Sequence, residues 1–328
     1  MQKPKLLDQV RDLARLQRKS RRTIDAYIYW IRQFIFFHDK RHPKDMGAEE
    51  VGRFLTHLVS NQRVAASTQK QALCAIVFLY KQVLRIDLGD ISFLHCKRQP
   101  RLPSVLSRSE VWAVLDQLRG DWWVLAALLY GCGLRLMECL RLRVGDIDLA
   151  RMTITVRAGK GDKDRILPLP QMLASHLSRQ VELVGRIHSR DLAAGYGAVS
   201  LPGALSRKYP SAPLELRWQW LFPASQLSVD PDGGSRKRYH LHESTLQKQV
   251  RNAARRAGLV KRVSPHTLRH TFATHWLEDA EGAQDIVLPR LQRLLGHKKI
   301  ETTMVYLHLI TPAKVGSPLD NRPLAIAI

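Results

Sequence analysis

Hydrophobic residues in the first hundred positions recur at the spacing of amphipathic helices. Between residues 20 and 38, apolar side chains fall three or four positions apart and so share one helical face. Residues 47–61 and 67–84 repeat this pattern. Three or four such helices, joined by short polar connections, predict a small helical bundle that makes a first domain, residues 1–95.

A basic stretch with two prolines follows the bundle. Residues 96–107 are therefore predicted to be an extended, positively charged linker. Ser107 followed by Glu110 has the spacing of a capping box, which predicts that a new helix begins there. Two domains joined in this way can hinge around a rod-shaped ligand.

The remainder of the chain, residues 108–310, mixes helical and strand patterns. Residues 121–142 predict two helices that meet at a glycine turn. Residues 152–157 and 165–170 predict two strands joined by a glycine-containing hairpin loop. The fold class expected is mainly α with a small β-sheet (α+β). Helical spacing predicts further helices at 243–257, 265–278, 290–296 and 300–309.

Residues 186–242 show neither the helical nor the strand spacing of apolar residues, and they are rich in Gly, Pro, Trp and Arg. They are therefore interpreted as an inserted segment. The segment interleaves aromatic and cationic side chains, as stacking on unpaired bases requires. The alternative is that its tryptophans form a small core that anchors a surface loop. The candidate base-contacting residues are Trp218, Trp220, Arg236, Tyr239 and His240.

The charge of the chain indicates the class of partner. Its 52 Lys and Arg against 29 Asp and Glu give a formal net charge of +23, and the excess is shared by both predicted domains. Such a field favours a polyanion, most commonly nucleic acid. The longest apolar run, residues 122–134, is shorter than the ~20 residues that span a bilayer, and no secretion signal is visible. We therefore expect a cytoplasmic protein without membrane contact.

The four cysteines have no C-x-x-C spacing and are interpreted as small core residues in a reducing compartment. A different set of residues is suited to bind an anion. Pro265 opens a predicted helix that carries His266, Arg269 and His270 on one face of its first turns. Two histidines four positions apart have zinc spacing, but no adjacent Glu and no third ligand accompany them. A helix N-terminus with a guanidinium instead suits a phosphate.

Together with Arg135, which follows the glycine turn, these residues fit attack on a phosphodiester. Paired arginines stabilise charge on the non-bridging oxygens. A tyrosine, with a reference pKa of about 10, becomes a nucleophile when a base such as His266 accepts its proton. A lysine in the hairpin tip can protonate the leaving oxygen. No metal or cofactor is required, because side chains supply the positive charge.

Five short motifs, "GCGLR", "KGDKDR", "HTLRH", "LLGH" and "TTMVY", occur in this order and resemble the active-site boxes of the tyrosine recombinase family. The resemblance implies a helical core-binding domain and a catalytic domain that form a C-shaped clamp around DNA. It implies a 3′-phosphotyrosyl intermediate that a free 5′-hydroxyl resolves without ATP. The catalytic set that it implies is Arg135, Lys160, His266, Arg269, His297 and Tyr306.

The inserted segment is similar to the extra segment of integron integrases, and "GSPLD" near the C-terminus fits the same subgroup. This resemblance implies integration and excision of gene cassettes at sites folded from single-stranded DNA, with the segment contacting bases pushed out of the stem. It also implies self-association, as a tetramer on two DNA sites. Residues 311–328 are expected to dock on a neighbouring protomer; the alternative is a frayed tail.

Three points depart from the family pattern or stay open. The 278–289 loop is longer than the family spacing, which can alter how His297 is presented. Lys163 lies in the same hairpin as Lys160 and can serve in its place. His270 either buttresses the site or satisfies a backbone carbonyl. Two alternative functions remain: a topoisomerase-like enzyme that relaxes DNA, and a non-catalytic DNA-binding protein with a decayed site.

Overall fold

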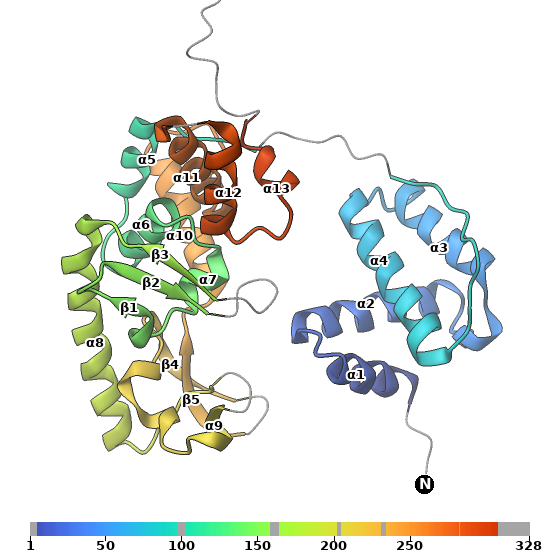
Figure 1. Cartoon of the computed structure of the whole chain (residues 1–328). Helices are drawn as coiled ribbons and strands as arrows, with labels where there is room; N and C mark the ends of the chain where they lie inside the picture. The colour runs from blue at the N-terminus through green and yellow to red at the C-terminus, as the bar shows by residue number, and fades with distance from the viewer. Residues whose placement is uncertain are drawn as a thin grey trace, which may run out of the picture. The chain divides into compact units, whose positions relative to one another are not determined.

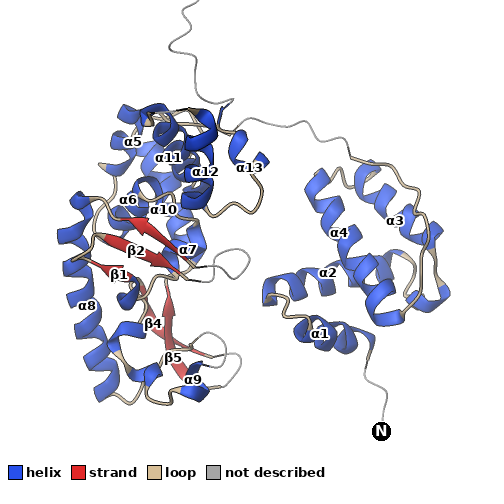
Figure 2. Cartoon of the chain, viewed as in Figure 1, coloured by secondary structure: helices blue, strands red, loops and turns tan. Residues whose placement is uncertain are grey.

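The structure of the protein is a computed structural model that describes residues 5–96, 103–157, 164–201, 205–230, 234–281 and 283–307. The chain forms two compact units, residues 1–101 and 102–328 (Figure 1). Both are mostly helical, and the strands form small antiparallel sheets, which confirms the predicted fold class (Figure 2). Among the described residues no helix is both long and apolar enough to cross a membrane.

The first unit is a helical bundle. Its apolar faces meet in one core that includes Ile31, Phe34 and Phe54, as the helical spacing predicts. Ser20 caps the second helix by accepting a hydrogen bond from the backbone of Thr23. The α-helices are α1 (Leu6–Leu16), α2 (Arg21–Phe37), α3 (Ala48–Ser60) and α4 (Ala66–Phe78), and α4 continues into a π-helical turn, Leu79–Leu84.

The second unit surrounds a central apolar helix with further helices and two small sheets (Figure 2). Its helices are α5 (Arg108–Leu115), α6 (Asp121–Gly131), α7 (Leu136–Leu140), α8 (Ala174–Ala193), α9 (Leu205–Lys208), α10 (Glu243–Arg256), α11 (Pro265–Asp279), α12 (Gln284–Leu295) and α13 (Glu301–Met304). Its strands are β1 (Ile147–Asp148), β2 (Thr153–Val156), β3 (Arg165–Pro168), β4 (Pro223–Val229) and β5 (Arg236–His240).

Helix α6 is central because it is apolar on nearly all sides, and it contacts α5, α7, α8, α10 and α11. Strands β1, β2 and β3 pair antiparallel in that order. Ile154 of β2 pairs with Leu167 of β3, and both side chains point into the same core as α6. This packing holds α7 and β3 next to the helices that carry the candidate site.

Two expectations about chain organisation are corrected. The segment 186–242 is not irregular throughout, since α8 continues to Ala193 and β4 and β5 form a hairpin. The 278–289 loop is also shorter than expected, because α11 ends at Asp279 and α12 begins at Gln284. Pro289 lies inside α12, where buried Val287 and Leu291 hold the helix against α11 despite the lost backbone donor. Residues 97–102, 158–163 and 308–328 lie outside the described residues.

Candidate active site

Helix α11 begins with a hydrogen-bonded cap that fixes the direction of its first turns. Ser264 accepts from the backbone of Thr267 and Pro265 occupies the first helical position, as expected for a strong N-terminus. Arg269, one turn further on, is only 3% exposed. Its guanidinium donates to the carbonyls of Gly133 and Leu295, the latter at 2.7 Å. Two other segments of the chain thus orient this arginine.

The Gly133 turn requires glycine for two reasons. Its φ is +61°, a left-handed conformation that L side chains rarely adopt. A Cβ at this position would also lie 2.3 Å from a ring carbon of Phe272 in α11. The close approach lets the Gly133 carbonyl reach Arg269 and places Arg135 at the start of α7.

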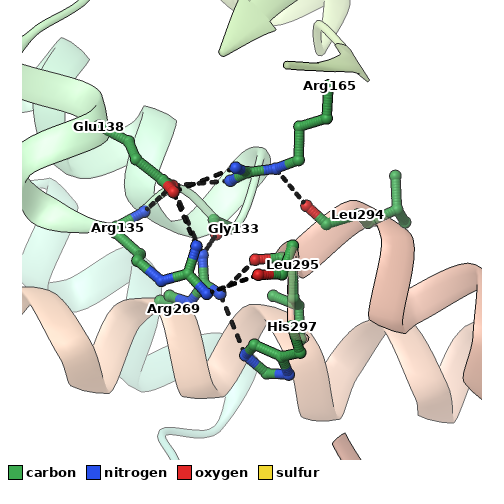
Figure 3. Close-up of polar contacts among 9 residues, drawn as sticks. Gly133, Arg135, Glu138, Arg165, Arg269, Leu294, Leu295 and His297 are labelled. Atoms are coloured by element: carbon green, nitrogen blue, oxygen red, sulfur yellow. Dashed lines mark hydrogen bonds and ion pairs between the residues drawn. The ribbon is translucent and has the colours of Figure 1, made fainter. Parts of the chain in front are cut away.

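Glu138 joins the arginines of the site (Figure 3). It accepts from Arg135 at 2.7 Å and from Arg165 of β3 at 3.0 and 2.7 Å, and it lies 3.8 Å from the Arg269 guanidinium. Burial alone would raise the pKa of Glu138, but the hydrogen bonds and charge of Arg165 and Arg135 lower it to about 2. The carboxylate therefore stays ionised and fixes the relative positions of the three guanidinium groups.

Neither Glu138 nor Arg165 is among the residues expected from the sequence. The position of Glu138 carried a usable signal, because it is three residues after Arg135 and accepts from the Arg135 backbone at 2.8 Å, as in a capping box. Arg165 is the last residue of the "KGDKDR" motif, but no local pattern indicated its role, since its partners Glu138 and Leu294 lie far away in the sequence.

The C-terminal end of α12 supplies His297. Gly296 ends the helix with φ +62°, and its carbonyl accepts from Arg135 at 3.0 Å. His297 Nε2 accepts from Arg269 at 3.2 Å, so Nδ1 carries the proton and donates to the Thr303 hydroxyl at 2.9 Å. Burial, followed by the charge of Arg269, lowers the pKa of His297 to about 4. The imidazole is therefore neutral at pH 7.

Tyr306 follows α13 and is 3% exposed, packed against Ala273 and Leu277 of α11 and against α12. Its hydroxyl lies 2.9 Å from His270 Nδ1, and its ring stacks on His297 with centroids 6.2 Å apart. Burial raises the pKa of Tyr306, and the charge of Arg269 opposes this.

The contact to the Tyr306 hydroxyl was expected at His266, and the structure has it at His270. The reason is the position along the helix axis. His266 and His270 share one face of α11, and Tyr306 packs further along it, against Ala273 and Leu277. The exposed His266 lies one turn nearer the N-terminus, its ring 6.5 Å from that of His270.

These residues surround a cavity of about 530 Å³. Its walls are strongly basic, since arginine, lysine and histidine side chains line it. Lys160 and Lys163 lie outside the described residues. Among the residues that the structure does describe, no three His, Cys, Asp or Glu side chains are gathered as a metal site. The lining residues are Pro103, Arg135, His266, Arg269, His270, Gly296, His297, Lys298, Lys299, Thr302, Val305 and Tyr306.

The family models match both units. Residues 6–90 match the phage integrase N-terminal SAM-like domain, and residues 123–311 match the phage integrase family. The chain belongs to the phage integrase family of tyrosine recombinases. It is a site-specific recombinase, an enzyme that transfers DNA strands.

Individual relatives agree with this assignment. An "Integrase/recombinase" of Escherichia coli and one of Pseudomonas aeruginosa are each 42% identical over 322 residues, which covers 97% of this chain and 94% of theirs. The tyrosine recombinase XerA of Thermococcus kodakarensis is 31% identical over 297 residues, 89% of this chain and 86% of that one.

Solved structures show the same fold. XerH recombinase bound to its difH substrate has a TM-score of 0.60 at 19% identity, covering 96% of this chain and 86% of that one. A lambda integrase dimer bound to a COC′ core site has a TM-score of 0.61 at 14% identity, covering 92% and 93%. At these identities the likeness concerns the fold alone.

The two tryptophans of the recombinase's inserted segment differ in burial. Trp218 is 9% exposed and packs with Val199 and Ala212 in a small apolar cluster. The ring of Trp218 is enclosed, as the alternative of a small anchoring core expects. Trp220 is half-buried, with the Arg143 guanidinium 3.9 Å from its ring centroid.

Arg143 was not singled out from the sequence. It is buried and donates to the carbonyls of Trp218 and Ser200, the latter at 2.9 Å, so it ties the inserted segment to the end of α7. Burial lowers the pKa of Arg143 to about 10. The contacts of Arg143 are with segments that are distant in sequence, so no local pattern could predict them.

The other candidates of the inserted segment lie on β5. Arg236 is exposed, and Tyr239 is half-buried with its hydroxyl donating to Asp230 at 3.1 Å. The His240 ring meets the Trp220 ring edge to face, with centroids 5.2 Å apart. His240 Nδ1 lies 2.8 Å from the Leu241 carbonyl, which leaves Nε2 for another partner. The structure thus groups Trp220 with His240, and Trp220 also packs against the apolar cluster that encloses Trp218.

Proposed function

We propose that the recombinase cleaves and rejoins DNA through Tyr306, with Arg135, Arg269 and His297 around the scissile phosphate, and that it integrates and excises gene cassettes at folded single-stranded sites. The first part is carried by one observation. Two arginines, three histidines and the tyrosine converge on a single basic cavity.

The chemistry of these groups suits phosphoryl transfer. The Arg135 and Arg269 side chains line the cavity, and hydrogen bonds to backbone carbonyls and, for Arg135, to Glu138 fix their positions. They can therefore stabilise negative charge on the non-bridging oxygens without having to move during the reaction. Tyr306 forms a 3′-phosphotyrosyl link, and a lysine, Lys160 or Lys163, protonates the departing 5′-oxygen. Because the link conserves the energy of the phosphodiester, rejoining to a new 5′-hydroxyl needs no ATP.

Double-stranded DNA and folded single strands are the proposed partners, and two DNA sites held by a tetramer are the proposed assembly. The net charge of +23 supports a polyanionic ligand. The XerH and lambda integrase structures, by their titles, contain difH and core-site DNA. Docking of residues 311–328 on a neighbouring protomer is part of the same proposal.

The preference for cassette sites rests on the β4–β5 hairpin and its base. Arg236, Tyr239 and the Trp220–His240 pair offer cationic and aromatic groups at partly exposed positions, which suits unpaired bases. Trp218 supports them from within the apolar cluster.

Covalent trapping tests the proposal. Wild-type enzyme and Tyr306→Phe are mixed with nicked suicide substrates from a panel of cassette-type sequences, each as a folded single-stranded hairpin with extrahelical bases and as a perfect duplex. We expect a slower band on a denaturing gel with wild type only, stronger for the hairpin. Equal bands for hairpin and duplex would overturn the cassette preference.

The same experiment separates the alternatives. Tight binding without any covalent band would indicate a DNA-binding protein with a decayed site. A band together with relaxation of supercoiled DNA, but no exchange between two sites, would indicate a topoisomerase-like enzyme.

A further inference from the structure

The hydroxyl of Tyr306 and the imidazole of His270 form a pair whose purpose the family resemblance does not supply. The hydroxyl lies 2.9 Å from Nδ1, and the ring centroids are 5.6 Å apart. Tyr306 is almost fully enclosed, so its hydroxyl hydrogen needs an acceptor inside the protein. His270 Nδ1 is within reach of that hydrogen.

The direction of this hydrogen bond follows from the protonation states. Burial lowers the pKa of His270 to about 4, and the charges of His266 and Arg269 add to this, so the imidazole is neutral at pH 7. Burial raises the pKa of Tyr306, so the phenol keeps its proton. A phenol is a stronger donor than acceptor, and it therefore donates to an unprotonated Nδ1.

The other two histidines of the cavity are less suited to this task. Both ring nitrogens of His297 are engaged, one by Arg269 and the other by Thr303. The His297 ring lies nearly parallel to the Tyr306 ring, with centroids 6.2 Å apart. His266 is exposed, and its ring centroid is 6.5 Å from that of His270. His270 is thus the imidazole in contact with the reacting oxygen.

We propose that His270 is the general base of strand cleavage, accepting the phenolic proton of Tyr306 at Nδ1 and returning it on rejoining. This inference rests on Tyr306 being the nucleophile. As the Tyr306 oxygen bonds to phosphorus, the bond from phosphorus to the 5′-oxygen breaks. The phenolic proton passes to Nδ1, and a separate acid protonates the 5′-oxygen. Rejoining reverses each transfer, so protons and charge balance over the cycle.

Phosphate binding strengthens this base at the moment it is needed. The cationic side chains around His270 oppose its protonation in the free enzyme. A phosphodiester between Arg135 and Arg269 brings a negative charge that offsets them, and this raises the pKa of His270. The charged and titratable groups that line the cavity with His270 are His266 and Arg269 on α11, Arg135 at the start of α7, His297, Lys298 and Lys299 after α12, and Tyr306.

The test uses the full-length chain and the duplex of the panel that gives wild type its strongest covalent band. In His270→Asn, the amide oxygen takes the place of Nδ1 and still accepts a hydrogen bond, but it does not take up a proton. We expect single-turnover formation of the covalent complex to slow by about 10²-fold or more. The wild-type rate should fall toward low pH as His270 becomes protonated, and the variant should lack this acid limb.

Two matched substitutions control the result. His266→Asn should slow the reaction but keep the acid limb, because it leaves the base in place. His176→Asn, in α8 against Trp123, lies outside the cavity and should react as wild type does. A wild-type rate in His270→Asn, or an acid limb lost only in His266→Asn, would overturn the inference.

The Tyr306→Phe variant keeps the two proposals distinguishable. If it still gives a covalent band, the nucleophile is another residue and the proposed function fails. If it gives none while His270→Asn reacts like wild type, only the role of His270 fails.

A second measurement needs no DNA and covers the case in which His270→Asn does not fold. In wild type labelled with ¹⁵N-histidine, the Nδ1 resonance of His270 should show an unprotonated nitrogen that accepts a hydrogen bond, and it should shift in Tyr306→Phe. A protonated Nδ1, or a resonance that is the same in both proteins, would contradict the proposal.

Discussion

The active-site cavity and the inserted segment both bury arginines, but they hold them differently. In the cavity, Arg135 and Arg269 are anchored on one side by Glu138 and backbone carbonyls and line an open space on the other. In the inserted segment, Arg238 makes a two-pronged ion pair with Asp191 at 2.5 and 2.7 Å and donates to two carbonyls of β4. Arg238 has its hydrogen-bonding capacity used within the protein, whereas the cavity arginines face a site for a ligand.

This difference indicates which arginines bind a ligand and which stabilise the fold. A guanidinium enclosed by its partners contributes to stability and local order, and breaking one partner leaves a costly unpaired charge. A guanidinium held from behind over a cavity is available to bind an anion. Substitutions in the two regions should therefore separate into effects on folding and effects on reaction.

The largest effect is expected at the enclosed pair. Asp191→Ala leaves Arg238 buried without its counter-ion, which should lower the free energy of unfolding by about 3–5 kcal/mol. Chemical denaturation measures this, and the covalent-complex rate per folded molecule on duplex DNA should not change. Glu182→Ala, an exposed carboxylate on the same helix, is the control and should cost less than about 0.5 kcal/mol. If Asp191→Ala lost cleavage but kept normal stability, the distinction between structural and ligand-binding arginines would be contradicted.

The next effect concerns Glu138 and has a defined pH dependence. Its folded-state pKa of about 2 lies below the ordinary value of 4.5. Its contribution to the free energy of unfolding is therefore complete above pH 4.5 and is lost as pH falls toward 2. A shift of that size corresponds to about 3 kcal/mol.

Glu138→Gln should therefore be less stable than wild type at pH 7, and the gap should shrink below pH 4.5. Urea unfolding across a pH series measures it. The variant should also form covalent complex more slowly, because Arg135 and Arg165 lose their anchor. Glu215→Gln, at an exposed position, controls for the substitution itself. A stability gap that stays constant down to pH 2 would show that the carboxylate charge is not what stabilises the cluster.

The smallest expected effect is a change in the preference of the enzyme for hairpin over duplex DNA. Trp220→Ala should weaken binding to a hairpin with extrahelical bases by roughly tenfold relative to a plain duplex, within the ~1–3 kcal/mol expected for one stacked base. Trp218→Ala should instead lower thermal stability and affect both DNAs alike, because its ring packs inside the apolar cluster. Competition binding with the two DNAs distinguishes these outcomes. Equal loss on both DNAs for Trp220→Ala would mean that Trp220, like Trp218, is structural.

Local patterns predicted the elements well where a segment carries its own signal. The helical spacing of residues 20–38 and 47–61 predicted α2 and α3, and the Ser107–Glu110 capping box predicted the start of α5. The pattern failed where tertiary contacts decide. Helix α12 begins at Gln284, well before the predicted residue 290, because packing against α11 outweighs the presence of Pro289.

The candidate site divides in the same way. Motif order alone nominated Arg135, Arg269, His297 and Tyr306, and the structure brings these residues to one cavity. The motifs did not identify the partners of these side chains. Glu138, Arg165 and the contact between His270 and Tyr306 join α7, β3, α11 and the end of α13.

By itself, then, the sequence determined the family, the helical character and the types of side chain available for chemistry, because periodicity, capping and motif spacing act over a few residues. Only the tertiary structure decided which imidazole meets the Tyr306 hydroxyl and which arginines stay open to a ligand. Those outcomes depend on which turn of α11 packs against Tyr306 and on carbonyl and carboxylate acceptors supplied by distant segments, such as Gly133 and Leu295 for Arg269. Hydrogen-bond partners must lie within about 3 Å of each other, and that proximity arises only when the core packs.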